Sequence, residues 1–285
     1  MTTTEMTSAE PAAPPPPKGF FKRLFKPRKP IVAVVPMSGA IMANGSIGRA
    51  FDDAQLAPLF EKAFTMAGIR AVALAINCPG GSPVQSSMIG ARIRRLADKY
   101  QVPVYAFCAD VAASGGYWLA CAADEIYADD CSIVGSIGVI AQSFGLHEAI
   151  GKLGVERRVH TAGGSKSFWD PFSPEKPEDV DRLLHLQGQM HTTFIDWVKS
   201  RRGDRLSDET ELFDGSFWVG REAHGLGLVD GLGHLVPVMT EKFGDKTRFR
   251  VLARKKGLFA RAGLPGADTL ADEIAVRGLY ARFGL

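Results

Sequence analysis

The stretch Asp110-Val-Ala-Ala-Ser114-Gly115-Gly116-Tyr117-Trp118 sets one serine among residues too small to shield it. It lies between an expected strand, residues 102–108, and an expected helix, residues 117–123. A serine at such a turn stands out of the sheet, with backbone N–H groups beside it as donors for an oxyanion. Ser114 is therefore a candidate nucleophile. A tight packing corner is the alternative interpretation of the same small residues.

A second glycine turn precedes the first: Ile76-Asn77-Cys78-Pro79-Gly80-Gly81-Ser82-Pro83, directly after the apolar run 72–76. This pattern predicts a buried strand that ends in a sharp turn, whose backbone is free to approach a ligand closely. An ordinary Pro-Gly turn is the alternative. Since the two turns follow successive strands, we expect them at neighbouring strand ends that face one crevice, where open α/β sheets bind ligands.

A nucleophilic serine needs a base, and Lys166 is the candidate. It lies in the glycine loop Thr161-Ala-Gly-Gly-Ser-Lys166-Ser-Phe-Trp-Asp-Pro-Phe172, after an expected strand, residues 155–161. Burial against Phe168, Trp169 and Phe172 would disfavour the ammonium form and make the amine a usable general base. His147 and His160 are the alternative bases, and a solvated loop lysine is the alternative interpretation of Lys166.

Five motifs in one order resemble the signal peptide peptidase A family, serine/lysine peptidases of the ClpP/crotonase fold. They are the Asn-x-Pro-Gly-Gly turn with Gly80 and Gly81, Ala113-Ser-Gly-Gly-Tyr-Trp118, Val134-Gly-Ser-Ile-Gly-Val139, Lys166, and Trp218-Val-Gly-Arg-Glu-Ala223 with Leu226-Gly-Leu-Val-Asp-Gly-Leu-Gly233. The resemblance implies that Ser114 is the nucleophile and Lys166 the general base. It also implies oxyanion amides at Gly81 and Gly115.

The chain departs from that family at three points. Cys78 stands where serine is usual, although a backbone role of the turn does not depend on this side chain. The chain shows one copy of a domain that larger members carry twice, and the usual membrane anchor is not visible. An early apolar run, residues 31–35, is far shorter than the ~20 residues that a bilayer requires. We therefore expect no signal peptide or transmembrane helix, and a cytoplasmic or peripheral location.

Alternating apolar runs predict an α/β fold with a parallel sheet and flanking helices. The expected strands are residues 31–35, 71–76, 103–108, 125–128 and 137–140, and the expected helices are residues 51–67, 83–99, 178–201 and 268–283. Apolar side chains of residues 178–201 recur at helical spacing, which favours a core-facing stripe, with assembly as the alternative. We expect a peptidase domain at residues 31–240 and a basic tail at residues 241–285.

Composition agrees with one large domain: 285 residues, 46% of them hydrophobic, suffice for a buried core. The four cysteines show no metal-type spacing and are expected to be reduced and buried. Asp124, Asp129 and Asp130 suggest a metal site only weakly, because adjacent acids near strand ends are usually solvated. Arg221 is expected in a cap or ion pair. We expect no metal and no cofactor.

Residues 1–30 differ from the rest. Residues 1–17 are too polar and proline-rich to pack a core, which predicts disorder. Residues 1–30 hold six basic and two acidic side chains, a net charge of +4 against +3 for the whole chain. Phenylalanines alternate with cations from Lys18 to Lys29, as in an interfacial anchor on an anionic membrane; a solvated linker is the alternative. Nucleic acid is not expected, because no basic face continues into the domain.

Together these patterns predict a serine endopeptidase with a Ser114–Lys166 dyad, acting on small, unfolded or membrane-derived peptides. We also expect a homo-oligomer, since family members resemble rings in which a lysine comes from a neighbouring domain. Ser136 is interpreted as part of a substrate floor rather than as the nucleophile. The alternatives are an acyl-CoA enzyme of the crotonase type, although neither turn contains its usual carboxylates, and a non-catalytic membrane-surface scaffold.

Overall fold

The computed structural model describes residues 29–43, 50–208, 210–253 and 276–285. A mostly parallel sheet lies at its centre, in the order β10-β1-β4-β5-β6-β9, and β7 pairs with β5 in parallel and with β8 antiparallel. Its strands are β1 (Ile31–Ser38), β4 (Ile69–Cys78), β5 (Val104–Ala113), β6 (Glu125–Ala128), β7 (Ile133–Gly135), β8 (Phe217–Val219), β9 (Gly231–Leu232) and β10 (Arg248–Val251). A short parallel pair, β2 (Ala40–Ile41) and β3 (Ala50–Phe51), lies apart from it. The expected parallel α/β architecture is confirmed.

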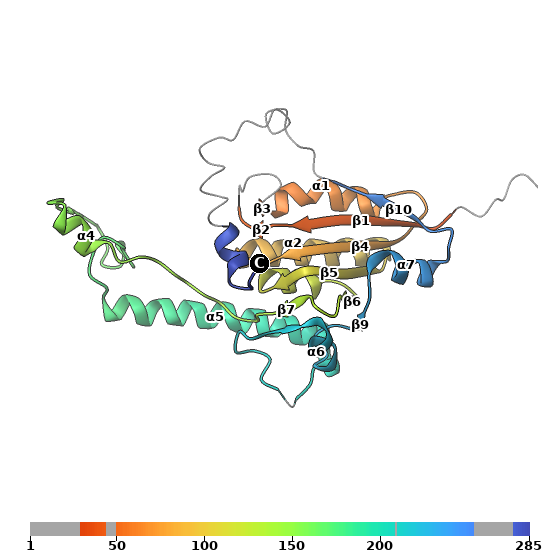
Figure 1. Cartoon of the computed structure of the whole chain (residues 1–285). Helices are drawn as coiled ribbons and strands as arrows, with labels where there is room; N and C mark the ends of the chain where they lie inside the picture. The colour runs from red at the N-terminus through yellow and green to blue at the C-terminus, as the bar shows by residue number, and fades with distance from the viewer. Residues whose placement is uncertain (1–28, 44–49, 209, 254–275) are drawn as a thin grey trace, which may run out of the picture.

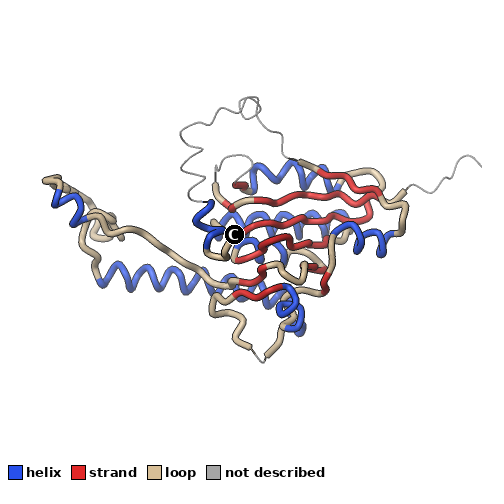
Figure 2. The backbone as a smooth tube through the Cα atoms, in the orientation of Figure 1, coloured by secondary structure: helices blue, strands red, loops and turns tan. Residues whose placement is uncertain are grey.

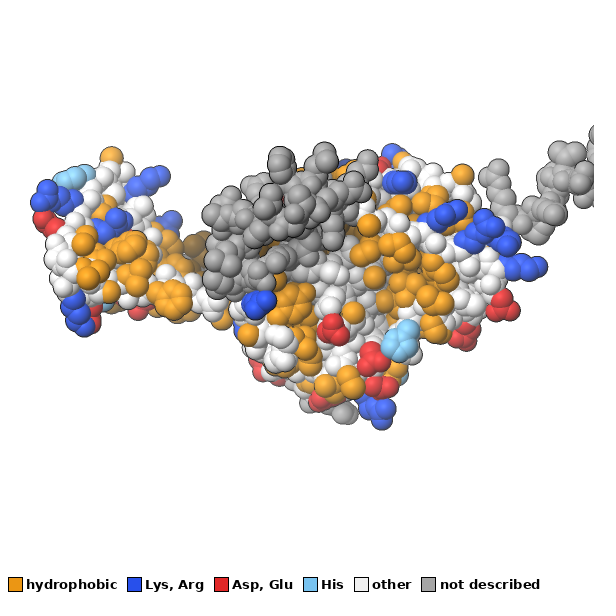
Figure 3. Space-filling view, turned by 45° about the horizontal axis from the view of Figure 1, so that its top comes forward, with side chains coloured by type: hydrophobic (Ala, Val, Ile, Leu, Met, Phe, Trp, Pro, Cys, Tyr) orange, Lys and Arg blue, Asp and Glu red, His pale blue; other side chains and the backbone are white. Residues whose placement is uncertain are grey.

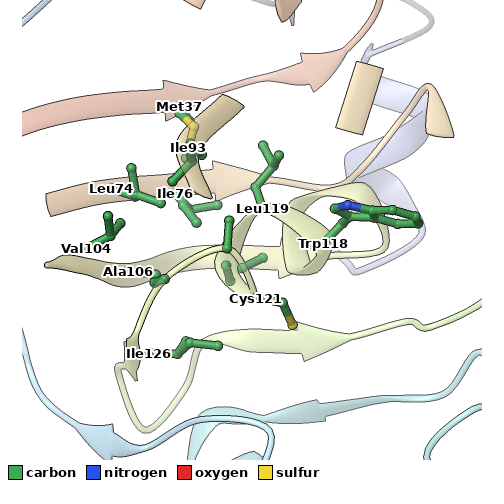
Figure 4. Close-up of a cluster of buried hydrophobic side chains, with 14 of the residues drawn as sticks. Met37, Leu74, Ile76, Ile93, Val104, Ala106, Trp118, Leu119, Cys121 and Ile126 are labelled. Carbon is green, nitrogen blue, oxygen red and sulfur yellow. The ribbon is translucent and has the colours of Figure 1, made fainter. Parts of the chain in front are cut away.

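Helices cover both faces of the sheet (Figure 1, Figure 2). One face packs against α1 (Asp53–Phe64), α2 (Pro83–Tyr100) and α3 (Gly115–Ala120), and the other packs against α7 (Leu235–Phe243). Successive residues of a strand point to opposite faces, so Val35 and Met37 join the first core while Val32 and Val34 join the second. Figure 4 shows the first core beneath α3, where Leu119 lies close to side chains of β4 and β5.

The parallel direction of the strands explains where a site can form. Because β1, β4 and β5 run parallel, their carboxyl ends meet at one edge of the sheet. Segment 276–285, dark blue in Figure 1, lies at this edge and is helical over residues 276–281. The expected helix 268–283 is thus observed only in part, since residues 268–275 lie outside the described ranges.

Residues 139–190 form an arm that projects from the body of the protein (Figure 1, Figure 2). It comprises a long loop, α4 (His147–Lys152) and the first half of α5 (Pro177–Arg202). Every residue of the arm is described, and none is buried. Of α5, only Phe194, Val198 and Arg202 are buried. The expected core-facing stripe is therefore wrong for the first half of this helix, because no part of the single chain lies beneath it.

Two expected strands are absent from the part of the chain that the structure describes. Residues 155–161 and 137–140 are irregular, and the strand near the second range is β7, at Ile133–Gly135. Both ranges contain apolar residues suited to a strand, but residues 155–161 lie on the arm, where no neighbouring strand supplies hydrogen bonds. Residues 137–140 follow the bend at Ser136, which turns the chain out of the sheet.

The end of the expected peptidase domain does not coincide with a break in the structure. Helix α7 continues to Phe243, and β10 adds to the sheet beside β1. The expected anchor, Lys18 to Lys29, lies almost wholly outside the described residues. The remaining short elements are α6 (Gly220–Gly225) and a 3-10 turn (Gly203–Arg205). Within the described ranges, no helix is both long enough and apolar enough to span a membrane.

A buried ion pair joins α5 to the loop before β9. Nη1 of Arg202 lies 2.7 Å from Oδ2 of Asp230, and the Arg202 side chain also donates to the carbonyl of Gly227. Asp230 accepts the N–H of Ile126 as well, which ties β6 to the same group. Burial of Asp230 opposes ionisation, but the hydrogen bonds and charge of Arg202 outweigh it and hold the pKa of this carboxyl below its ordinary value.

We predict that Asp230→Asn lowers the free energy of unfolding by about 3 kcal/mol, because Arg202 is left buried without its counter-charge. A carboxyl whose native pKa is lowered stabilises the fold above its unfolded pKa, and this contribution is lost as the pH falls through the native value. The wild type should therefore lose stability below about pH 4 more steeply than the variant. Denaturant titrations at pH 7 and pH 3 measure both effects.

Asp98→Asn is the matched control, since Asp98 pairs with Arg94 at the surface and its side chain is 70% exposed. Its effect should stay below about 0.5 kcal/mol. Equal losses for the two variants would contradict a structural role of the buried pair.

Candidate active site

Ser114 occupies a strained turn between β5 and α3. Its backbone has φ 53° and ψ −122°, a conformation that side-chain-bearing residues rarely adopt. Two backbone hydrogen bonds hold it there: the Ser114 N–H donates to the carbonyl of Gly135 at 2.8 Å, and its carbonyl accepts the N–H of Trp118 at 2.9 Å. The geometry is that of a nucleophile elbow, which lifts the hydroxyl out of the sheet.

The turn after β4 packs directly against this elbow. A Cβ on Gly80 would lie 2.8 Å from Cβ of Ser114 and 3.1 Å from the nitrogen of Gly115, so a larger residue does not fit. Gly80 and Gly81 have φ values of 110° and 141°, which other residues rarely adopt. The two glycine turns predicted to face one crevice do so.

The backbone N–H of Gly81 is left free because Ile41 forms its hydrogen bonds with the residues on either side, Gly80 and Ser82. Ile41 bridges Gly81 in parallel, donating its N–H to the carbonyl of Gly80 and accepting the N–H of Ser82. In this pattern the N–H and carbonyl of Gly81 point away from Ile41. A Cβ on Gly81 would strike the carbonyl of Ile41, which accounts for the glycine. Gly115 is the first residue of α3, where an N–H has no acceptor within its helix.

Ser114 opens onto two adjoining cavities. The first, of about 240 Å³, is lined by Gly81 and Gly115 and by apolar side chains that include Trp118, Met190 and Phe194. The second, of about 370 Å³, is lined by Ser136, His191, Asp214 and Arg282 among others. Leu279 and Arg282 of segment 276–285 also line the first cavity.

Lys166 does not reach Ser114 within one chain. It lies in the loop of the arm after α4, is exposed, and lines neither cavity that contains Ser114. The expected burial of its amine by Phe168, Trp169 and Phe172 is not met in the single chain, since the arm has nothing packed upon it. Of the alternative bases, His160 is exposed on the arm, and His147 lines a separate cavity there.

Sequence reasoning missed His191. This residue lies on α5, and its Nε2 is 3.0 Å from the carbonyl of Ile137, at the cavity that holds Ser114. The signal was available, because His191 lies three and seven residues before Phe194 and Val198, on the buried side of the helix. Ser136 was assigned to the substrate floor and does line this cavity, with a positive φ of 53°.

Cys78 is a packing residue rather than a second nucleophile. It is fully buried at the end of β4, and burial raises the pKa of its thiol to about 12. Cys108 and Cys121 are buried in the same way, whereas Cys131 is exposed, so the prediction of buried thiols fails for Cys131. All four are free thiols.

Arg221 forms the expected ion pair, with its Nε 2.8 Å from Oδ1 of Asp130. In the described ranges, no group of three or more potential ligands is arranged for a metal ion.

The fold and site define a parallel α/β protein with a serine at a strand-to-helix elbow. The model of peptidase family S49 matches residues 97–246, and the chain belongs to this family. It is 48% identical to the Na(+)/H(+) antiporter NhaA of Brucella melitensis over 93% of this chain and 37% of that protein. It is 33% identical to a putative protease of Methanocaldococcus jannaschii over 58% of this chain and 52% of that protein.

Among solved structures, a mutant of the 1510-N membrane-bound stomatin-specific protease in complex with a substrate peptide aligns at 12% identity and a TM-score of 0.45. The alignment covers 86% of this chain and 99% of that one. The chain thus spans about a third to a half of the length of the first curated relatives that it matches.

The buried thiols lead to a labelling prediction. With pKa values of about 12, Cys78, Cys108 and Cys121 hold almost no thiolate at pH 8, and the fold shields them. Iodoacetamide should therefore modify Cys131 in the native protein and all four cysteines after unfolding. Peptide mapping of both samples measures this. Rapid native labelling of Cys78 would contradict its assignment as a packing residue.

Proposed function

We propose that this protein is a serine peptidase in which Ser114 is the nucleophile and the amides of Gly81 and Gly115 bind the oxyanion. The observation on which this rests is the contact between the Gly80–Gly81 turn and the strained Ser114 elbow. It brings a hydroxyl and two backbone donors to one cavity. The apolar lining favours peptide segments with apolar side chains, as in small, unfolded or membrane-derived peptides.

The chemistry follows from these positions. The Ser114 oxygen attacks the peptide carbonyl carbon while its proton passes to the neutral amine of Lys166. The tetrahedral oxyanion accepts hydrogen bonds from the Gly81 and Gly115 amides, and its collapse expels the amine product, which takes the proton from Lys166. Water then attacks the ester and loses its proton to Lys166. Collapse of this second intermediate releases the acid product, and the Ser114 oxygen takes the proton back from Lys166, which restores both groups.

Lys166 would come to this cavity from a neighbouring copy of the chain. On the arm that bears it, large apolar side chains are exposed, and orange side chains gather at its outer end in Figure 3. Among them are Phe144, Leu146, Leu153, Val155 and Leu184. Apolar surface of this extent calls for a partner. A homo-oligomer in which each arm covers Ser114 of the next copy would bury this apolar surface and complete each dyad. Such head-to-tail contacts generate a ring when the rotation between copies closes.

Three other assignments compete with this one. His191 is the rival base because it lines the cavity of Ser114 within the same chain. An acyl-CoA enzyme would use the same oxyanion amides but needs a carboxylate for proton transfer. Asp214 is the acid that lines the second cavity, and its pKa is lowered by hydrogen bonds from Ser216, so it is a poor base near neutral pH. A non-catalytic scaffold would not require a strained serine beside free amides.

Ser114→Ala and Lys166→Ala should each abolish peptide hydrolysis, and mixing them should restore it if the dyad forms between copies. Random mixing puts an intact Ser114 beside an intact Lys166 at about one interface in four, so the mixed oligomer should recover about a quarter of the wild-type rate. Hydrolysis of a fluorogenic peptide after co-refolding measures this. Lys166→Arg should stay inactive, because the guanidinium does not deprotonate.

Lys152→Ala, at an exposed lysine of the same arm, is the control and should retain activity. His191→Gln should also retain it. An inactive His191→Gln with an active Lys166→Ala would transfer the base role to His191. No recovery on mixing, with both single variants assembled, would contradict a dyad shared between copies.

We further propose that residues Lys18 to Lys29 bind the surface of an anionic membrane. Six cations supply an attraction of about 1 kcal/mol each near the surface, and Phe20, Phe21 and Phe25 add apolar burial that salt does not screen. Full-length protein should sediment with phosphatidylserine vesicles at low salt, less at high salt, and not after deletion of residues 1–30. Full-length protein that stays in the supernatant at low salt would identify the segment as a linker.

A further inference from the structure

Segment 276–285 supplies part of the wall of the cavity at Ser114, although it lies outside the residues that the family model matches. The hydroxyl of Tyr280 donates to the carbonyl of Asn77 at 2.8 Å, at the end of β4 and next to the Gly80–Gly81 turn. The Phe283 ring packs edge-on against Phe217 of β8, with centroids 5.1 Å apart. Val276 is buried. The segment is therefore seated across the carboxyl edge of the sheet (Figure 1).

The packing of segment 276–285 places Arg282 at the cavity. Val276, Leu279 and Phe283 recur at helical spacing and face the body of the protein. Arg282 lies beside that apolar face, at the rim, and lines both cavities onto which Ser114 opens. Among the residues that line the first cavity, Arg282 is the charged one; the others are apolar or neutral.

The guanidinium has no carboxylate partner in the described parts of the chain. Its recorded neighbour is the Phe283 ring, 5.8 Å from Cζ. Asp214 and His191 line the second cavity with it, but the Asp214 carboxylate accepts the backbone N–H of Ser216 at 2.8 Å and His191 bonds the carbonyl of Ile137. Other arginines of the body that lie near acids pair with them, as Arg92 does with Asp53. Arg282 keeps its donors free at the cavities onto which Ser114 opens.

From this we infer that Arg282 determines specificity, by binding a carboxylate of the peptide close to the bond that Ser114 cleaves. The inference rests on the proposed peptidase function and adds a substrate class: peptides with an apolar side chain for the Trp118 side of the cleft and a carboxylate for the Arg282 side. A guanidinium presents a fork of N–H donors that matches a carboxylate. The carboxylate belongs either to an Asp or Glu side chain or to the end of the peptide.

The test uses matched fluorogenic peptides. One set carries Glu or Gln at each of the three positions before and after the cleaved bond, and a second pair ends in a free carboxylate or an amide. Wild-type protein should prefer the best-placed acidic peptide by about fivefold in kcat/KM, chiefly through KM, as the upper range for an ion pair open to water. The set that shows the preference identifies the source of the carboxylate.

Substitutions assign the preference to Arg282. Arg282→Gln should bring the ratio of kcat/KM for acidic over neutral peptides close to one. Arg282→Lys should keep part of this preference, and Arg282→Glu should reverse it toward a Lys-containing peptide. Arg250→Gln, which removes the same charge from exposed β10, should leave the ratio unchanged. An equal loss on acidic and neutral peptides would overturn the inference, as would a change in oligomer size on sedimentation, which would assign Arg282 to a contact between copies.

A binding experiment separates this inference from the peptidase proposal. Fluorescence anisotropy of labelled peptides on Ser114→Ala, with and without Arg282→Gln, reads carboxylate recognition without any turnover. Tighter binding of acidic peptides that depends on Arg282 supports the inference even if hydrolysis fails. Hydrolysis that requires Ser114 but shows no acidic preference at any position overturns it and leaves the peptidase proposal intact.

Discussion

Contact between two glycine-rich turns is the constraint on which this site depends. Parallel pairing of β4 with β5 brings the turn after each strand to the same edge, and Gly80 then meets Ser114 so closely that a single added carbon does not fit. A Cβ on Gly116 would likewise strike the carbonyl of Cys78. The amide of Gly81 stays free at the cavity because Ile41 pairs with its neighbours Gly80 and Ser82. The amide of Gly115 stays free because Gly115 is the first residue of α3.

The same contact explains how a strained serine persists. A positive φ at a residue with a side chain costs on the order of 1–3 kcal/mol and is kept only where the surroundings impose it. Here β7 accepts the Ser114 N–H through Gly135, and α3 begins immediately afterwards and is buried throughout. Beneath the elbow, Trp118 stacks on Phe194 of α5, and both rings belong to the larger hydrophobic core.

Local pattern is sufficient to predict the central strands β1, β4, β5 and β6, both glycine turns and the helices α1, α2 and α5, because each depends on neighbours in sequence. The turn at Gly80–Gly81 and the elbow at Ser114 each have a backbone signature that only small residues satisfy. The pattern failed where long-range packing decides. Residues 155–161 contain β-branched residues suited to a strand but have no strand beside them. Helix α5 carries apolar residues along its whole length, while only its second half meets the core. For His191 the helical spacing from Phe194 and Val198 is a local signal, whereas Arg282 reaches the cavity through tertiary contacts that no local motif predicts.

The arm also acts mechanically as a lever. Helix α5 is held at His191, Phe194 and Val198 and projects from there to Pro177, a length of about 21 Å at 1.5 Å per residue. A tilt of about 10° at the root therefore moves the outer end by about 4 Å, several times the tolerance of about 0.5 Å for groups that react with one another. Rigid packing at the buried end of α5 therefore does not by itself position the residues at the outer end of the arm. In the proposed dyad, the position of Lys166 would instead be set by the surface that receives the end of the arm, so the accuracy of that surface would set the accuracy of the chemistry.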